Sequence, residues 1–280
     1  MAALAAYAPR VRYALIFLVA CGGNGGGGGG GDDTPGPDAA VAPAHSGFVS
    51  IQSYDAMNIP GTPTRGGSTS AGFFTAGSAC TTMQTIGPCK VQQCATTQPQ
   101  GAQSAGTITI TGATKPLSLV PGTDKLYAQQ TSMTSLFNGG DMITFAAGGA
   151  DVPAFSVTLT TPTKATITAP AKPSAGSLLA INRAQDFSVS WSGGGSGRVQ
   201  VFLSGTGGSS SLFCKFDASA GTGKVPAAAL ATMTGTMGSF AMASIAETDK
   251  TAGDWGIGAS AYFNAVWPDA AIVSGGTMIQ

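Results

Sequence analysis

Apolar and polar residues alternate with a period of two along several stretches of the chain. From Phe155 to Thr160, the residues Phe, Val and Leu alternate with Ser and Thr, and Thr107 to Thr111 places two Ile among three Thr. This alternation predicts antiparallel strands with one face in a core and the other in water. The same pattern recurs in stretches that begin at Phe187, Arg198, Leu212 and Trp255.

Helical patterns are sparse. The best one is Pro226 to Met233, where a proline suited to the first helical turn precedes three Ala and a Leu, and it predicts at most about two turns. Clusters of Gly, Ser, Thr, Asn and Pro separate the alternating stretches at short intervals, as in sandwiches and barrels. The sequence therefore predicts an all-β fold of one or two antiparallel β-sandwiches.

One internal boundary is indicated by composition. Residues 161–173 contain three prolines among Thr, Lys and Ala, which divides the chain into a β-rich domain at 47–163 and a second domain at 164–280. The second has an early Trp191, a central Cys214 and a late aromatic strand, an order compatible with an immunoglobulin-like sandwich. The expected partner cysteine on an earlier strand is missing, so the expectation concerns architecture alone.

The N-terminal residues have the plan of a signal peptide. Arg10 and Arg12 precede an apolar run over residues 13–20, which ends at Cys21. The run is shorter than the roughly 20 residues that a membrane-spanning helix needs. Leu18 to Cys21 resembles the lipobox of bacterial lipoproteins, in which the cysteine is acylated after cleavage. The alternative is a short buried segment that ends in a cysteine.

The residues after Cys21 predict a flexible tether. Residues 22–31 are nine Gly and one Asn, and Asp and Pro follow without a hydrophobic pattern as far as Ser46. We therefore expect a signal peptide at 1–20 and a disordered tether at 21–46. The lipoprotein resemblance, without Asp directly after the cysteine, implies export and anchoring in the outer membrane of a Gram-negative bacterium, with the lipid bilayer as a partner through acylated Cys21.

The chain also resembles a class of secreted lipoproteins that is abundant in myxobacteria. These lipoproteins have no established activity. The resemblance covers most of the chain. It rests on the lipobox and the Gly-rich tether, on residues 139–141 leading into 152–155, on residues 186–191, and on Cys214 followed by residues 225–230. It implies an anchored β-rich protein and no particular chemistry.

Four cysteines remain if Cys21 is lipidated: Cys80, Cys89, Cys94 and Cys214. An even number in an exported chain predicts two disulfides, with three possible connectivities. A hairpin could join Cys80 to Cys89 and leave Cys94 for Cys214, while joining Cys80 to Cys94 is nearly as good. A zinc site is disfavoured because the chain has no CxxC pair and its only histidine lies in the expected tether.

The charge balance excludes several function classes. The chain has 13 basic and 13 acidic residues, so it lacks the basic surplus of a nucleic-acid-binding protein. From residue 47 onward, 11 basic and 10 acidic residues remain. No calcium motif of the DxDxDG type is present. We expect no nucleic-acid partner, no metal site and no cofactor.

The groups needed for catalysis are scarce. His45 is the only histidine, Glu247 is the only glutamate, and no GxSxG motif occurs. Residues 218–225 resemble a phosphate-binding loop, but Val and Pro replace the hydroxyl and the helix that should follow, which favours a plain turn. The available carboxylates occur in turn-rich segments, where Asp is more often a turn residue: Asp141, Asp151, Asp186, Asp217 and Asp254. The sequence predicts that the protein is not an enzyme.

Aromatic residues near the C-terminus are the best candidates for ligand recognition. Trp255, Phe263 and Trp267 share the parity of Ile257 and are expected in the core. Tyr262 and Asn264 fall on the other face and remain as candidate contacts for a sugar ring. The predicted function is a non-catalytic structural or interaction role in the cell envelope, for which an envelope protein would be the partner. The alternatives are a module that binds carbohydrate or cell wall, for which wall or extracellular polysaccharide would be the partner, and, less favoured, a hydrolase of unknown type.

Overall fold

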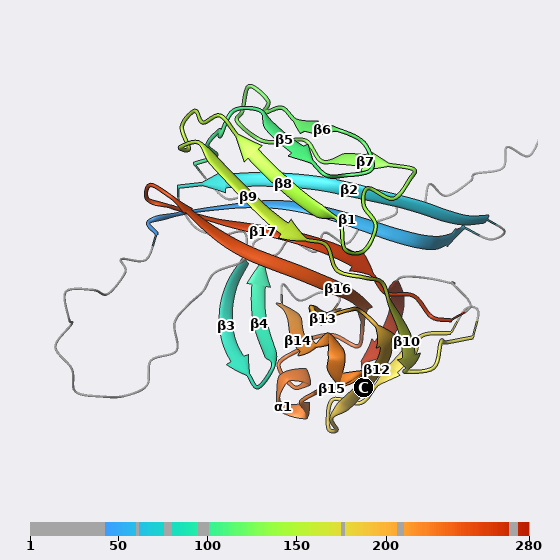
Figure 1. Ribbon diagram of the computed structural model, residues 1–280. Coiled ribbons are helices and arrows are strands. Elements are labelled where there is room, and N and C mark those ends of the chain that lie inside the picture. Colours follow the sequence, from blue (N-terminus) through green and yellow to red (C-terminus); the bar gives the residue numbers. More distant parts are fainter. Residues whose placement is uncertain are drawn as a thin grey trace, which may run out of the picture.

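The computed structural model describes residues 43–59, 62–75, 80–94, 101–174, 177–205, 210–268 and 274–279 (Figure 1). Nearly all regular structure within these residues is β, so the prediction of an all-β sandwich fold is confirmed. The more specific immunoglobulin-like topology stays a prediction. The expected signal peptide, Cys21 and most of the expected tether lie outside the described residues.

Three sheets contain the described strands. An 11-stranded sheet has the order β3-β4-β14-β13-β16-β17-β1-β2-β7, and β18 joins it beside β16 and pairs with β11. Its strands are β1 (His45–Ile59), β2 (Thr62–Phe74), β3 (Cys80–Ile86), β4 (Cys89–Cys94), β7 (Gln130–Ser132), β11 (Leu179–Ile181), β13 (Arg198–Gly205), β14 (Ser210–Asp217), β16 (Met237–Ala252), β17 (Trp255–Asn264) and β18 (Ser274–Ile279).

Two smaller sheets pack against this large one. A four-stranded sheet, β6-β5-β8-β9, lies over β1, β2 and β17, and a three-stranded sheet, β10-β12-β15, lies near β13 and β14 (Figure 1). The four-stranded sheet consists of β5 (Ile108–Thr111), β6 (Leu117–Leu119), β8 (Met142–Ala147) and β9 (Phe155–Thr160). The three-stranded sheet consists of β10 (Ala165–Ala169), β12 (Phe187–Gly193) and β15 (Thr222–Val225).

The long strand β16 belongs to both sandwiches. Its first half pairs with β13 and β18, and its second half pairs with β17. Since side chains alternate along a strand, its even-numbered residues share one face: Phe240 and Met242 enter the core near β12, while Ala252 enters the core under β8 and β9. The odd-numbered residues, including Glu247, point to the opposite face of the large sheet.

A tight turn connects β16 to β17. Ala252 pairs directly with Trp255, so the turn has two residues between the strands. Gly253 adopts φ +59° there, a left-handed conformation that a residue without Cβ adopts at little cost and that two-residue hairpins require. The register continues along β17, whose other edge pairs in parallel with β1 from His45 onward.

Strands from both sides of the expected boundary at residues 163/164 share the large sheet. β1 pairs with β17, and β4 pairs with β14. The two cores are mixed in the same way, because Cys89 and Val91 pack among residues 165–279, while Trp255 and Ile257 pack among residues 49–159. Local composition marks neither of these long-range pairings.

The helical and loop segments agree with their sequence patterns. The helix α1 spans Ala227–Leu230, a single turn that begins directly after Pro226. The segment that resembles a phosphate-binding loop forms a 3-10 turn, Ala218–Ala220, followed by β15, in which Lys224 pairs with Ser188. Lys224 is therefore a strand residue, as the plain-turn interpretation allows. In the described part of the chain, no helix is both long enough and apolar enough to span a bilayer.

Candidate functional site

The structure corrects the expected exposure of Tyr262. Its side chain is 1% exposed and packs with Ala243 and Ile245. Ile245 lies opposite it on β16 and Gln52 lies opposite it on β1, so neighbours on both sides enclose the ring. The expectation of a solvent-facing ring is wrong because alternation identifies a face of a strand and not what covers that face. Trp255, Phe263 and Trp267 are buried as expected.

Asn264 takes part in a contact between strands. Its Oδ1 accepts a hydrogen bond of 2.7 Å from Nε2 of Gln52, and Oε1 of Gln52 accepts one of 3.3 Å from Ser68. These bonds link β17, β1 and β2 across the face that also carries Tyr262. Asn264 and Tyr262 are therefore neighbours on one face, but the pair offers no open aromatic surface.

His45 is held in the fold, although it was expected in the tether. It is the first residue of β1 and its ring lies 5.0 Å from that of Trp255. Nε2 lies 3.3 Å from an oxygen of Asp254, and Nδ1 lies 3.3 Å from the carbonyl oxygen of Thr75. Both ring nitrogens are thus engaged by structural partners, which leaves neither one free to activate a nucleophile.

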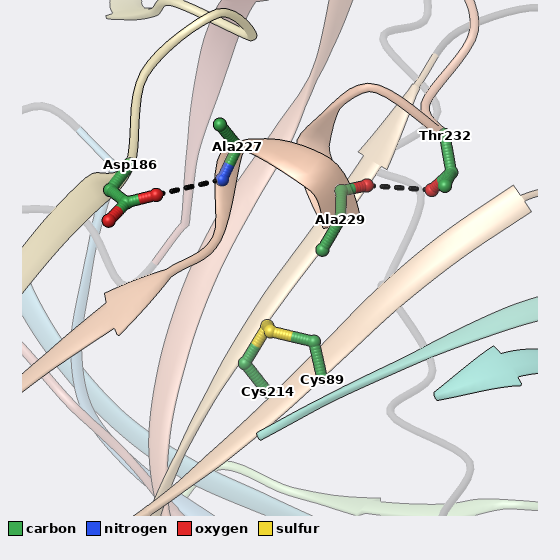
Figure 2. Close-up of a disulfide and its surroundings, with 6 residues drawn as sticks. All are labelled: Cys89, Asp186, Cys214, Ala227, Ala229 and Thr232. Carbon is green, nitrogen blue, oxygen red and sulfur yellow. Dashed lines mark hydrogen bonds between the residues drawn. A yellow bond between two sulfur atoms is a disulfide. The ribbon is translucent and has the colours of Figure 1, made fainter. Parts of the chain in front are cut away.

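Two of the candidate carboxylates bind backbone amides. Asp141 accepts hydrogen bonds from the backbone and the side chain of Asn138. Asp186 accepts one of 3.0 Å from the backbone amide of Ala227, at the first residue of α1 (Figure 2). Asp141 fixes local backbone geometry, as expected for Asp in turns, whereas Asp186 binds the start of a helix 41 residues away. No group of three or more metal-ligating side chains occurs among the described residues.

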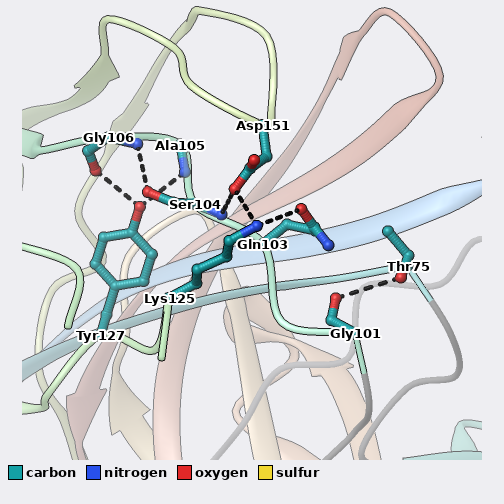
Figure 3. Close-up of polar contacts among 9 residues, drawn as sticks. All are labelled: Thr75, Gly101, Gln103, Ser104, Ala105, Gly106, Lys125, Tyr127 and Asp151. Carbon is teal, nitrogen blue, oxygen red and sulfur yellow. Dashed lines mark hydrogen bonds and ion pairs between the residues drawn. The ribbon is translucent and has the colours of Figure 1, made fainter. Parts of the chain in front are cut away.

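Asp151 anchors a polar cluster at one end of the four-stranded sheet (Figure 3). Its Oδ2 accepts a bond of 3.0 Å from the backbone amide of Ser104 and lies 3.0 Å from Nζ of Lys125, which also donates to Gln103. The Ser104 amide and then the Lys125 ammonium lower the pKa of Asp151 below its ordinary value. The cluster is exposed and joins loops, so we assign it a structural role.

The lowered pKa of Asp151 gives a pH dependence with a definite sign. Its ionised form stabilises the fold above the pKa of an unfolded Asp, about 3.9, and this contribution disappears as the pH falls through the lower folded value. We expect Asp151→Asn to lower the melting temperature slightly at pH 7, with the gap closing below about pH 4. Thermal unfolding from pH 2 to 7 measures the melting temperatures, with Asp249→Asn as the control. A difference in melting temperature that does not change with pH would contradict the assignment.

A cavity lined by several charged side chains lies on the outer face of the large sheet. It has a volume of about 240 Å³ and is formed by β3, β4, β13, β14 and β16. In Figure 1, β3, β4, β13 and β14 lie in the lower half, below β16. The polar and charged side chains that line it come from all five strands, and the one aromatic side chain comes from β14: Thr85, Lys90, Gln92, Arg198, Gln200, Phe213, Lys215 and Glu247.

The charges of this cavity are unequal. Three cationic side chains surround one carboxylate. Nζ of Lys215 donates to both oxygens of Glu247, at 2.7 and 2.6 Å, which neutralises that pair. Lys90 and Arg198 have no ion-pair partner among the described residues, although Asp217 lies opposite Arg198 in the register. The smaller cavity thus holds two cations that no described residue pairs with, although Asp217 beside Arg198 reduces the net positive charge there.

A larger cavity adjoins the first one. It has a volume of about 570 Å³, and Arg198 and Glu247 line both cavities. Its other polar side chains are mostly hydroxyls, together with the carboxylate of Asp217: Thr158, Thr160, Ser196 and Thr248. We call the two cavities together the strand-face groove.

A disulfide braces the strands that carry the two lysines. Cys89 of β4 and Cys214 of β14 lie opposite each other in the register, with Cα atoms 3.9 Å apart, and both are fully buried in the core (Figure 2). Lys90 and Lys215 are the next residues along these strands and therefore point to the opposite face. The core disulfide thus fixes the spacing of the groove cations.

The observed disulfide also decides between the expected connectivities. A bond between Cys80 and Cys89 is wrong, because Cys89 is bonded to Cys214. Cys80 pairs with Cys94 in the backbone register of β3 and β4. The side chains of both lie outside the described residues, so a second disulfide between them stays a prediction.

Comparison of the chain with models of known protein families finds no match, and comparison with curated proteins finds none either. The resemblance to myxobacterial lipoproteins therefore stays a prediction. The sequence interpretation missed the groove, whose residues come from parts of the chain as distant as residues 85 and 248. One local signal was present: Lys90 with Gln92 and Arg198 with Gln200 place long polar groups on one face of each strand.

Proposed function

We propose that this protein is an exported, lipid-anchored lipoprotein that binds a ligand or partner in the cell envelope without catalysing a reaction. The observation that supports binding is the strand-face groove, where two cations without ion-pair partners among the described residues lie beside two amides, Gln92 and Gln200. The amides are 5% and 4% exposed and can both donate and accept hydrogen bonds. Such groups recognise ligands through charge and hydrogen bonds.

A hydrolase fits the same groove less well. Glycoside hydrolysis uses two carboxylates with separate roles, one of which delivers a proton. Glu247 and Asp217 both line the larger cavity, but Lys215 contacts both oxygens of Glu247, an arrangement typical of a structural ion pair. His45 is engaged at both nitrogens and lines neither cavity. We therefore favour binding.

The anchor is proposed from the sequence. The sequence has the order of a lipoprotein signal, with Arg10 and Arg12 first, then the apolar run and then Cys21. About 25 residues separate Cys21 from β1. A Gly-rich coil of that length would span about 25–30 Å. The groove could then reach ligands that lie beyond the membrane surface.

The anchor is tested by the variant Cys21→Ser. In a Gram-negative host fed radiolabelled palmitate, the wild-type protein should be labelled and should sediment with outer membranes. The variant should carry no label, since serine lacks the thiol that receives the diacylglycerol. Asn24→Ser, a change within the Gly-rich stretch, serves as the control and should label normally. Label on Cys21→Ser would contradict the lipobox assignment.

A second candidate is a carbohydrate- or cell-wall-binding module. The groove favours it, because hydroxyl, amide and cationic side chains lie in one depression together with Phe213. The full chain, purified in detergent, should be retained on insoluble peptidoglycan or on immobilised soluble polysaccharide. Retention on either material supports the carbohydrate role. If the protein is retained on neither, an envelope protein is favoured as the partner.

A further inference from the structure

We propose that the strand-face groove binds an acidic oligosaccharide, with one sugar carboxylate at Lys90, a second at Arg198 and neighbouring rings in the hydroxyl-lined cavity. This inference rests on the proposed binding function and names its site and ligand class. No comparison or sequence motif assigns a ligand to these residues.

The placement of charge supports an anionic ligand. Of the three cations in the smaller cavity, Lys215 is occupied by Glu247, which leaves Lys90 and Arg198 unpaired among the described residues. The guanidinium of Arg198 has a planar fork of donors that matches the two oxygens of a carboxylate. Lys90 adds a point charge at the other end of the same cavity, because it lies opposite Phe213 of β14 whereas Arg198 lies opposite Asp217.

The remaining groups of the smaller cavity suit a sugar ring. Gln200 can pair with a hydroxyl as donor or as acceptor, and Gln92, whose Nε2 donates to Thr82 at 3.4 Å, keeps its Oε1 as an acceptor. Phe213, which packs at a ring distance of 5.1 Å against Phe202, offers an apolar surface to the carbon-bound hydrogens of a sugar. A volume of about 240 Å³ lies below the range of roughly 300–1,000 Å³ for drug-sized ligands, so it suits a small ring system.

The adjoining cavity supports a chain of sugars over a single one. Arg198 and Glu247 line both cavities, so a sugar chain that contacts these two side chains lies next to both cavities. Thr158, Thr160 and Thr248 place hydroxyls along the larger cavity, where neutral sugar hydroxyls can bond to them.

The same groove disfavours densely charged polyanions. Glu247 and Asp217 place two carboxylates along it beside three cations, so its summed charge is small. Polyphosphate or nucleic acid would bring a negative charge at every repeat and would meet these carboxylates. A sugar chain with one carboxylate per ring carries both a charged group and neutral hydroxyls on each ring. It can therefore contact the cations and the hydroxyls of the groove.

Binding of tetragalacturonate to the full chain in detergent tests the proposal. Its fully methyl-esterified form is the matched neutral ligand, and inorganic tripolyphosphate is the dense polyanion. We expect calorimetry to detect binding of tetragalacturonate. The ester should bind at least about tenfold more weakly, because a charge-assisted hydrogen bond is lost. The double variant Lys90→Gln/Arg198→Gln should weaken tetragalacturonate by about tenfold or more.

The control variant is Lys224→Gln/Lys250→Gln, which removes two positive charges outside both cavities. It should bind tetragalacturonate like the wild-type protein. Circular dichroism and thermal unfolding of both double variants establish that they are folded. The proposal would be overturned if tetragalacturonate and its ester bound with equal affinity, or if both double variants weakened tetragalacturonate binding equally. Tighter binding of tripolyphosphate than of tetragalacturonate would also overturn it.

The outcome also separates this inference from the proposed function. If peptidoglycan or polysaccharide retains the protein while tetragalacturonate fails to bind, the ligand class assigned to the groove is wrong and the carbohydrate role stands. If the protein binds tetragalacturonate through the groove but Cys21→Ser is still labelled, the groove assignment stands and the lipid anchor fails.

Discussion

Replacing both cysteines in Cys89→Ala/Cys214→Ala should lower the free energy of unfolding by about 2–5 kcal/mol. The bond closes a loop of 125 residues in sequence, so its loss frees a large part of the unfolded chain. Alanine is the better replacement because both positions are 0% exposed and a serine hydroxyl would be buried among apolar groups. Urea denaturation of variant and wild-type proteins measures the difference.

The loss should concentrate at one edge of the large sheet. The strands β3 and β4 form its end, and β4 is joined to the rest by pairing with β14. Hydrogen exchange should therefore accelerate most in β3 and β4, and tetragalacturonate binding should weaken although Lys90 and Lys215 are intact. An unchanged urea midpoint, or exchange that rises equally everywhere, would contradict the bracing role.

Phe73→Ala is expected to lower the free energy of unfolding by about 3–5 kcal/mol. The side chain is 1% exposed, and its ring lies 5.9 Å from Tyr127, 5.8 Å from Phe155 and 6.1 Å from Trp255. It thus links β2 to the four-stranded sheet and to β17. Truncation leaves a cavity whose walls come from distant parts of the chain. These walls cannot all move inward to fill it.

Val120→Ala is the control for this core substitution. Val120 is 63% exposed, so the same type of truncation should change stability by less than about 0.5 kcal/mol. Urea denaturation measures both variants under the same conditions. A Phe73→Ala protein as stable as Val120→Ala would show that the aromatic cluster contributes no stability.

Local sequence predicted the strands best where one face is buried. The stretch Phe155–Thr160 is a strand whose residues alternate between buried and exposed, and Ile108–Thr111 behaves the same way. Trp191 and Trp255 are buried as their parity indicates. The reason is that a half-buried strand has one apolar face, and period two makes that face visible in a single segment.

The candidate site could not be predicted in the same way. Tyr262 was assigned to the correct face, but its exposure depends on Ile245 and Gln52, which other strands bring beside it. The groove needs Lys90, Arg198 and Glu247 on three strands of one sheet, in an order unrelated to their order in the chain. Strand order follows from long-range pairing, which leaves little trace in local composition.

The sequence by itself thus determined the all-β class, the apolar faces of the half-buried strands, and the small number of chemically reactive groups. Only the tertiary structure decided that β1 lies beside β17, that Cys89 bonds to Cys214, and that both halves of the chain share a sheet. The physical reason is that alternation is a property of neighbouring residues. Pairing, disulfide partners and the groove depend on the free energy of bringing distant strands together.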